Sequence, residues 1–233
     1  IEMMKARKSL SMFSATISRE VMDIGWLYQH NAEEITVQPK EESQPKITQY
    51  MLETSGRNKL SDLAQIIIGE GYKRVMVFCD TKFNTATLAN QLARLGFSVD
   101  CLHGDLSQKE RNQIMQNFRD GRLAILVATD VAARGLDVDD VDAVVNFELP
   151  RDPEDYVHRI GRTARAGRKG KAITFVGRRD FSLMSRIERF IGVKLTPEPV
   201  LTAVQVDQLR TESLVDDILE LSLIHISEPT RRV

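Results

Sequence analysis

The sequence predicts an α/β protein built on a doubly wound parallel β-sheet flanked by helices on both faces. Two patterns indicate this fold. From Ile47 onward, apolar runs of five or six residues alternate with segments whose apolar residues recur at helical spacing. The runs, such as residues 74–78 and 123–128, are continuously apolar, as is typical of strands covered on both sides. In such a sheet, ligands bind at the carboxyl ends of the strands, and the informative polar residues follow the runs there.

The individual elements can be placed in order along the chain. Strands are expected over residues 74–78, 97–101, 123–128, 142–147 and 171–176. Helical faces are marked by Leu60, Leu63 and Ile67 within residues 59–68, and then by Leu88, Leu92 and Leu95. Gly96 stands where a C-terminal cap belongs. Ser107 and Glu110 have capping-box spacing and open a helix that runs through Ile114 and Phe118.

The composition is that of an ordinary globular chain and excludes several classes of protein. The 233 residues are 42% hydrophobic and 28% charged, with a net charge of −1. This balance predicts no indiscriminate attraction to nucleic acid, so binding must come from local patches. Cys79 and Cys101 lie in apolar runs and are expected to be buried, reduced thiols. No apolar run is long enough to span a bilayer and no signal-peptide layout is present, so we expect no membrane association and a reducing cytoplasm.

The chain is expected to contain five segments. Residues 1–37 hold about one strand–helix–strand of material, with Val21, Ile24 and Leu27 in the helix, which is too little to bury its own apolar face. Residues 38–46 are polar, contain two prolines and are predicted to be a linker. The main domain is expected over residues 47–205, followed by an acidic segment, 206–221. Residues 222–233 resemble a translated sequencing-adapter peptide and are interpreted as a non-native tail.

The most informative stretch is rich in arginine and glycine and begins at His158. Residues 151–179 contain nine Arg or Lys and three acidic residues, a local excess of +6. On a helix entered near Pro153 and ending near Gly167, we expect Arg159, Arg162 and Arg165 to lie about one turn apart. Such planar, permanently charged donors suit a phosphate chain. The alternative is a solvated basic face, although the glycines among the arginines favour close approach of a ligand.

Three other groups of polar residues follow predicted strands. Thr81 comes after the first strand of the main domain, where a simple turn is the alternative. Gly104 and Arg111 flank the start of a capped helix, whose free N–H groups suit a nucleic-acid phosphate. Residues 128–137 read Ala-Thr-Asp-Val-Ala-Ala-Arg-Gly-Leu-Asp. Asp137 could accept from a ribose hydroxyl or pair with an arginine.

Taken together, these stretches resemble one family. His-Arg-Ile-Gly-Arg-Thr-Ala-Arg at 158–165 is similar to the last motif of the DEAD-box RNA helicases, a part of helicase superfamily 2. His-Gly-Asp at 103–105, Gln-Lys-Glu-Arg at 108–111 and the stretch 128–137 also follow the family pattern. Ser14-Ala15-Thr16 resembles its coupling motif. Ala164 stands where the family usually has Gly.

The resemblance, which covers about residues 8–205, implies the C-terminal RecA-like lobe of an ATP-dependent RNA helicase with the end of the first lobe attached. It implies that Arg162, Arg165 and His158 serve catalysis and that Asp137, Arg134, Arg162 and Arg165 bind ATP. It also implies that Thr81, Gly104, Arg111, Thr129 and Gly135 contact the sugar–phosphate backbone of RNA. The sequence lacks a phosphate loop and an Asp-Glu-Ala-Asp box, so ATP and Mg²⁺ are expected to depend mainly on the first lobe. No metal site is expected in this chain, and alone it is expected to be inactive.

Two alternatives stay open at this point. Another superfamily-2 motor, such as a DNA helicase, shares the fold and the Gly-Arg-x-x-Arg core, although such families commonly carry Gln where this chain has His158. A non-enzymatic nucleic-acid-binding module would not need the arginine pair, Arg162 and Arg165.

Overall fold

The computed structural model describes residues 10–13, 19–35, 46–134, 138, 141–164 and 169–199. The chain divides into two units, Ile1–Gln44 and Pro45–Val233. In the first unit, helix α1 spans Arg19–Tyr28, where a helix is predicted. Residues 10–13 and 31–35 have no regular secondary structure, so the strands expected beside this helix are not found there. Trp26 and Leu27 of α1 are 72% and 68% exposed, because the described residues of this unit provide no second layer of secondary structure against which they could pack.

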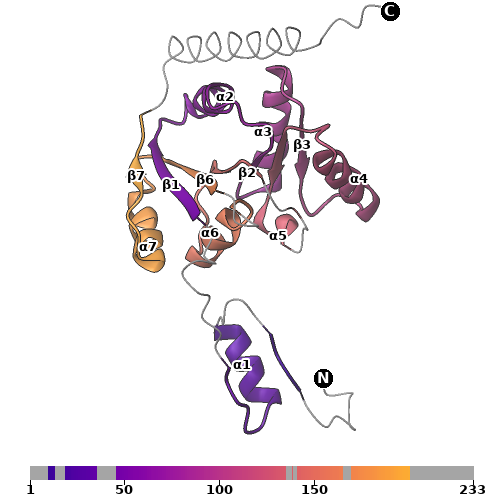
Figure 1. Cartoon of the computed structure of the whole chain (residues 1–233), viewed down its shortest axis with the longest axis vertical. Helices are drawn as coiled ribbons and strands as arrows, with labels where there is room; N and C mark the ends of the chain where they lie inside the picture. The colour runs from indigo at the N-terminus through magenta and orange to yellow at the C-terminus, as the bar shows by residue number, and fades with distance from the viewer. Residues whose placement is uncertain are drawn as a thin grey trace, which may run out of the picture. The chain divides into compact units, whose positions relative to one another are not determined.

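The second unit contains a seven-stranded sheet whose strands are all parallel (Figure 1). The strands are β1 (Lys46–Glu53), β2 (Val75–Phe78), β3 (Val99–Leu102), β4 (Ile125–Ala128), β5 (Ala143–Asn146), β6 (Lys169–Val176) and β7 (Thr196–Pro197). Their order across the sheet is β3-β4-β2-β5-β6-β1-β7. The predicted fold class is confirmed. β2, β4 and β5 are buried at every residue, which explains their continuous apolar runs.

Helices cover both faces of the sheet. They are α2 (Lys59–Gly69), α3 (Lys82–Arg94), α4 (Gln108–Arg119), α5 (Asp130–Ala133), α6 (Pro153–Ile160) and α7 (Phe181–Ile191). One apolar cluster joins α2 and α3 to alternate strand residues such as Val77 and Val127. The neighbouring residues Met76 and Leu126 point to the other face, against α4 and α5. A third cluster packs α6 and α7 against β6.

The predicted start of α4 is confirmed, and the predicted end of α3 is confirmed except for Leu95. The capping box at α4 is confirmed, since the Ser107 and Glu110 side chains each bond the other's backbone N–H. Gly96 has φ of +91° and directly follows the C-cap residue Leu95, a position where a left-handed glycine commonly ends a helix. Leu95 was assigned to the apolar face of α3, but it caps the helix and is 55% exposed.

β1 was not predicted as a strand, and it begins at the last residue of the predicted linker. It begins with mostly polar residues and then carries the apolar run Tyr50-Met51-Leu52, and Leu52 is its one fully buried residue. Cys79 and Cys101 are both free; Cys79 is buried, whereas Cys101 is only half-buried. Burial raises the pKa of both thiols, which keeps them protonated. Within the described ranges, no helix has the length and apolarity to cross a membrane.

Candidate nucleotide and nucleic-acid site

Three of the predicted RNA-binding residues follow neighbouring strands. Thr81, Gly104 and Thr129 lie just beyond the carboxyl ends of β2, β3 and β4. These strands are adjacent in the order β3-β4-β2, so the fold brings the three residues to one edge of the sheet. They are separated in sequence by more than twenty residues at each step, and only the parallel topology unites them.

Thr81 and Thr129 have the same local role. Each is the N-cap of a helix, and each side-chain oxygen accepts from the backbone N–H three residues later: that of Asn84 at 3.1 Å and that of Ala132 at 3.4 Å. A hydroxyl that accepts in this way still has its proton to donate. Two helix N-termini with hydroxyl donors therefore stand side by side, an arrangement that suits the oxygens of a phosphate backbone.

Arg111 and Gly104 complete this part of the edge. The Nη2 atom of Arg111 donates to the carbonyl of Ala132 at 3.0 Å, which ties α4 to α5 and orients the guanidinium. A Cβ atom at Gly104 would meet nothing within 4 Å, so the packing of the chain itself does not require glycine there. The Nδ1 atom of the preceding His103 is buried and has no hydrogen-bond partner in the described part of the chain. A bound ligand could supply that partner.

A small hollow of about 210 Å³ collects the predicted nucleotide-side residues that the structure describes. It is lined by Arg134, His158 and Arg162, together with Asp130, Asp155 and Arg159. Arg134 Nη2 lies 2.6 Å from Asp155 Oδ1, and this pairing raises the pKa of the Arg134 guanidinium. His158 Nδ1 lies 4.0 Å from the same oxygen. The Asp155 carboxylate thus holds Arg134 and lies near His158.

The prediction of one long helix through the arginine stretch is wrong. α6 ends at Ile160, with Gly161 as its C-cap. Thr163 then leaves the helical path, because it is fully buried and its Oγ1 donates to the Val141 carbonyl at 2.5 Å. Ala164 follows with φ of +59°, a left-handed conformation that a helix cannot contain. Arg162 therefore lies in a turn beyond the helix and not on a helical face with Arg159.

Arg159 differs most from its predicted position, since it is buried and not available to a phosphate. Only 1% of its side chain is exposed. Its Nε and Nη2 atoms lie 2.6 and 2.7 Å from the two carboxylate oxygens of Asp130. Its Nη1 donates to the Glu148 carbonyl at 2.6 Å, and its Cζ lies 5.1 Å from the centre of the Phe78 ring. A buried guanidinium is stable only when its donors are satisfied in this way.

Sequence reasoning missed the acidic partners of this arginine. Asp80 Oδ1 lies 3.6 Å from Arg159 Nη2. Glu148 accepts from the backbone N–H of Asp80 at 2.7 Å and from the Asn84 side chain at 2.6 Å. Burial, and secondarily Glu148, raises the pKa of Asp80, whereas Arg159 opposes the rise. Acidic residues directly after buried strands were the available signal, since Asp80 and Asp130 follow β2 and β4.

The structure leaves several predicted residues undescribed. Gly135, Asp137 and Arg165 lie outside the described residues, as do Ser14, Ala15 and Thr16. Within the described part of the chain, no group of three His, Cys, Asp or Glu side chains is arranged to hold a metal ion.

Comparison with known proteins identifies the family. Residues 58–167 match the family described as "Helicase conserved C-terminal domain". The solved C-terminal domain of the DEAD-box protein Dbp5 is 34% identical with a TM-score of 0.64, and the match covers 72% of this chain and 98% of that domain. The chain belongs to the DEAD-box family. It contains the C-terminal lobe of a DEAD-box protein, with the RecA-like sheet of that lobe.

Two further relatives extend the comparison of this DEAD-box lobe. The "DEAD-box ATP-dependent RNA helicase CshA" of Geobacillus kaustophilus is 41% identical over 184 residues, which is 79% of this chain and 39% of that protein. The structure titled "S. cerevisiae Dbp5 bound to RNA and ADP BeF3" is 33% identical with a TM-score of 0.72 and covers 89% of this chain and 54% of that one. The chain spans about a third to two fifths of the curated relatives' length.

Proposed function

We propose that the whole protein is an ATP-dependent RNA helicase and that this DEAD-box lobe supplies part of both its RNA site and its ATP site. The observation that supports this most directly is the clustering of Arg134, His158 and Arg162 around one hollow, beside the edge that carries Thr81 and Thr129. The groups proposed for the nucleotide and those proposed for RNA thus lie next to each other, at the carboxyl ends of the strands of one sheet. A non-enzymatic nucleic-acid-binding module would need only the RNA-side groups.

In the proposed ATP site, Arg162 and Arg165 stabilise the charge that develops on the β- and γ-phosphates during phosphoryl transfer. Arg134 and Asp137 lie on the nucleotide side, with Asp137 accepting from the ribose. His158 links this lobe to the first lobe of the same protein. The cationic groups of the described hollow fit a phosphate chain, whereas Mg²⁺ would be held mainly by carboxylates of the first lobe.

In the proposed RNA site, Thr81, Gly104, Arg111, Thr129 and Gly135 contact the sugar–phosphate backbone with little dependence on base sequence. The hydroxyl and N–H donors of the two capped helices support this assignment. Asp130 and Arg159 connect the loops of the two sites, so we propose that RNA binding and the position of Arg162 depend on each other through this pair.

The proposed arrangement of the chain follows from these roles. Residues 1–37 would be the end of the first lobe, with Ser14, Ala15 and Thr16 as its coupling motif, and 38–46 the linker. Residues 47–205 would form the C-terminal lobe, 206–221 an acidic segment and 222–233 a non-native tail. A reducing, cytoplasmic location is supported by the free thiols of Cys79 and Cys101.

The test is the RNA-stimulated ATPase activity of the full-length enzyme. Arg165→Ala is expected to lower kcat by on the order of 10³-fold while nucleotide affinity changes much less, and Arg165→Lys should rescue it poorly. Arg179→Ala, an exposed arginine outside both sites, is the matched control. If Arg165→Ala lowers the melting temperature but leaves kcat intact, the residue is structural and the catalytic assignment is wrong. Displacement of DNA duplexes in preference to RNA duplexes would favour the DNA helicase alternative.

A further inference from the structure

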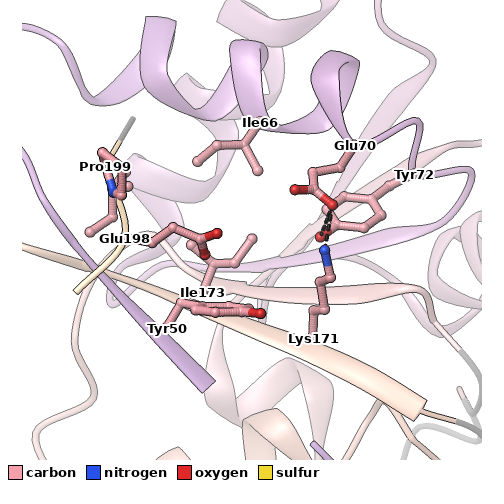
Figure 2. A pocket seen from close by; sticks show the side chains of 9 residues that line it. Tyr50, Ile66, Glu70, Tyr72, Lys171, Ile173, Glu198 and Pro199 are labelled. Atoms are coloured by element: carbon pink, nitrogen blue, oxygen red, sulfur yellow. Dashed lines mark hydrogen bonds and ion pairs between the residues drawn. The ribbon is translucent and has the colours of Figure 1, made fainter. Parts of the chain in front are cut away.

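A second, larger hollow lies on the α2 face of the sheet, away from the sites described above. It has a volume of about 450 Å³ and lies between α2 and strands β1 and β6 (Figure 2). Its walls include Glu70 and Tyr72, which precede β2, whereas the nucleotide and RNA loops follow the strands. None of its lining residues belongs to either proposed site. A ligand could therefore occupy it without competing directly with ATP or RNA.

The inner wall of the hollow is apolar. Ile66 comes from α2 and Ile173 from β6 (Figure 2), and Leu52 of β1 also lines the hollow. These three side chains are between 2% and 6% exposed. Two half-buried aromatic rings, Tyr50 and Tyr72, stand at the opening. Such a wall accepts an apolar stem, and the rings can stack with a planar or cationic group.

The opening carries an excess of negative charge. Glu70 is neutralised by its ion pair with Lys171 and also accepts from the Tyr72 hydroxyl at 3.3 Å. Glu198 follows the edge strand β7, and none of the ion pairs between described residues involves its carboxylate. Figure 2 shows this side chain reaching into the hollow. Burial and the two carboxylates together raise the pKa of Tyr72, as a locally negative field requires.

We propose that this hollow is a docking site for an arginine side chain carried by a segment of a partner protein. The methylene stem of arginine would lie along the apolar wall, and its planar guanidinium would pair with Glu198 between the tyrosine rings. Charge complementarity selects a basic side chain over an apolar or acidic one. The hollow is bordered by the edge strand β7, which consists of only two residues, so an extended segment can pass this edge and insert one side chain without parting strands.

The experiment is a titration of the ¹⁵N-labelled chain with the peptide acetyl-Gly-Ala-Arg-Ala-Gly-amide, followed by amide chemical shifts. We expect saturable shifts centred on Tyr72, Lys171, Ile173 and Glu198. A peptide that carries citrulline, the neutral isostere of arginine, should bind at least tenfold more weakly than the arginine peptide. The arginine peptide should likewise bind the Glu198→Gln variant at least tenfold more weakly than it binds the unaltered chain. Glu53→Gln is the matched control, since Glu53 is exposed and its side chain points to the opposite face of β1. An unchanged melting temperature of both variants shows that the fold is intact.

Three results would overturn the proposal. Equal binding of the citrulline peptide would mean that the hollow recognises shape or hydrogen bonds and not charge. Shifts confined to the Arg134–Arg162 hollow would place the arginine peptide elsewhere. Arg210 belongs to the acidic segment 206–221, which follows the lining residue Pro199 in the sequence. Tighter peptide binding by Arg210→Ala than by the unaltered chain would show that this arginine of the chain itself, and not a partner's, is the occupant.

Discussion

The carboxylate of Asp130 receives two parallel hydrogen bonds from the guanidinium of Arg159, at 2.6 and 2.7 Å. Asp130 opens α5, directly after the N-cap Thr129, and Arg159 lies one residue from the end of α6. The pair therefore fixes the RNA-side loop after β4 to the turn that carries Arg162. Because Arg159 is inaccessible to solvent, its charge serves this connection and not a ligand directly.

Replacement of Arg159 by Met should lower the free energy of unfolding by about 3–5 kcal/mol, because Asp130 and Asp80 lose their buried counter-charge. Chemical denaturation measures this loss. Arg159→Met combined with Asp130→Asn should recover part of the stability, since the double variant buries one charge fewer. Arg57→Met, at an exposed position, should change stability by about 0.5 kcal/mol or less. Similar losses for Arg57→Met and Arg159→Met would contradict the buried-pair assignment.

Gly170→Ala should destabilise the lobe by about 1–3 kcal/mol or more. A Cβ at this position would lie 2.6 Å from Thr163 Cγ2 and 2.7 Å from the Ala164 nitrogen, so the turn after α6 must shift. Gly56→Ala is the control, because a Cβ there meets nothing within 4 Å. Thermal melts of the two variants check the prediction, which fails if both alanines are tolerated equally.

Ala164→Gly should stabilise the lobe by up to about 1 kcal/mol. Ala164 holds φ of +59°, and relief of this left-handed strain outweighs the greater freedom that glycine gives the unfolded chain. Ala133→Gly, within the helix α5, should destabilise instead and serves as the opposite control. Melting temperatures that fall for both substitutions would show that the left-handed conformation is not maintained in solution.

Ionisation of Tyr156 should lower the free energy of unfolding of the lobe as the pH rises above 10. Burial raises its pKa from 10.0 to about 12, so between these values the unfolded chain ionises first and the free energy of unfolding falls. Its hydroxyl also donates to Gln49 Oε1 at 2.9 Å, a bond worth about 1 kcal/mol. Tyr156→Phe should therefore be less stable than the unaltered chain at pH 8. The gap should narrow between pH 10 and 12 in urea denaturation, and a constant gap would refute the raised pKa.

The strands of the core and the polar residues that follow them could be predicted because burial on two sides leaves a continuous apolar run, as in 125–128. β1 could not, since its mostly polar first half continues the preceding polar segment and equally suits an extended linker. The end of α6 depends on the bond from Thr163 to Val141, a long-range contact that no local pattern encodes.

Some residues of the candidate site could likewise be predicted from the sequence, and others could not. Motif positions such as Thr81 and Thr129 could be located from their place after strands, and the structure explains both as N-caps. The burial of Arg159 could not be foreseen, because Arg162 and Arg165 follow in the same stretch and nothing local distinguishes a buried guanidinium from an exposed one. Its three-dimensional partners, Asp80, Asp130 and Glu148, follow three different strands, β2, β4 and β5.

The pairing of β1 with β6 leaves β1 without its main partner strand while the chain between them is synthesised. Lys46 lies opposite Lys169, so β1 emerges from the ribosome about 120 residues before its main partner exists. At roughly 5–20 residues per second, that interval lasts on the order of 6–25 s. During this time the backbone donors and acceptors of β1 are unpaired, and its apolar residues Tyr50, Met51 and Leu52 are open to chaperones or to misplaced strands. A nascent lobe halted before β6 would thus expose its first strand as a persistent target for aggregation.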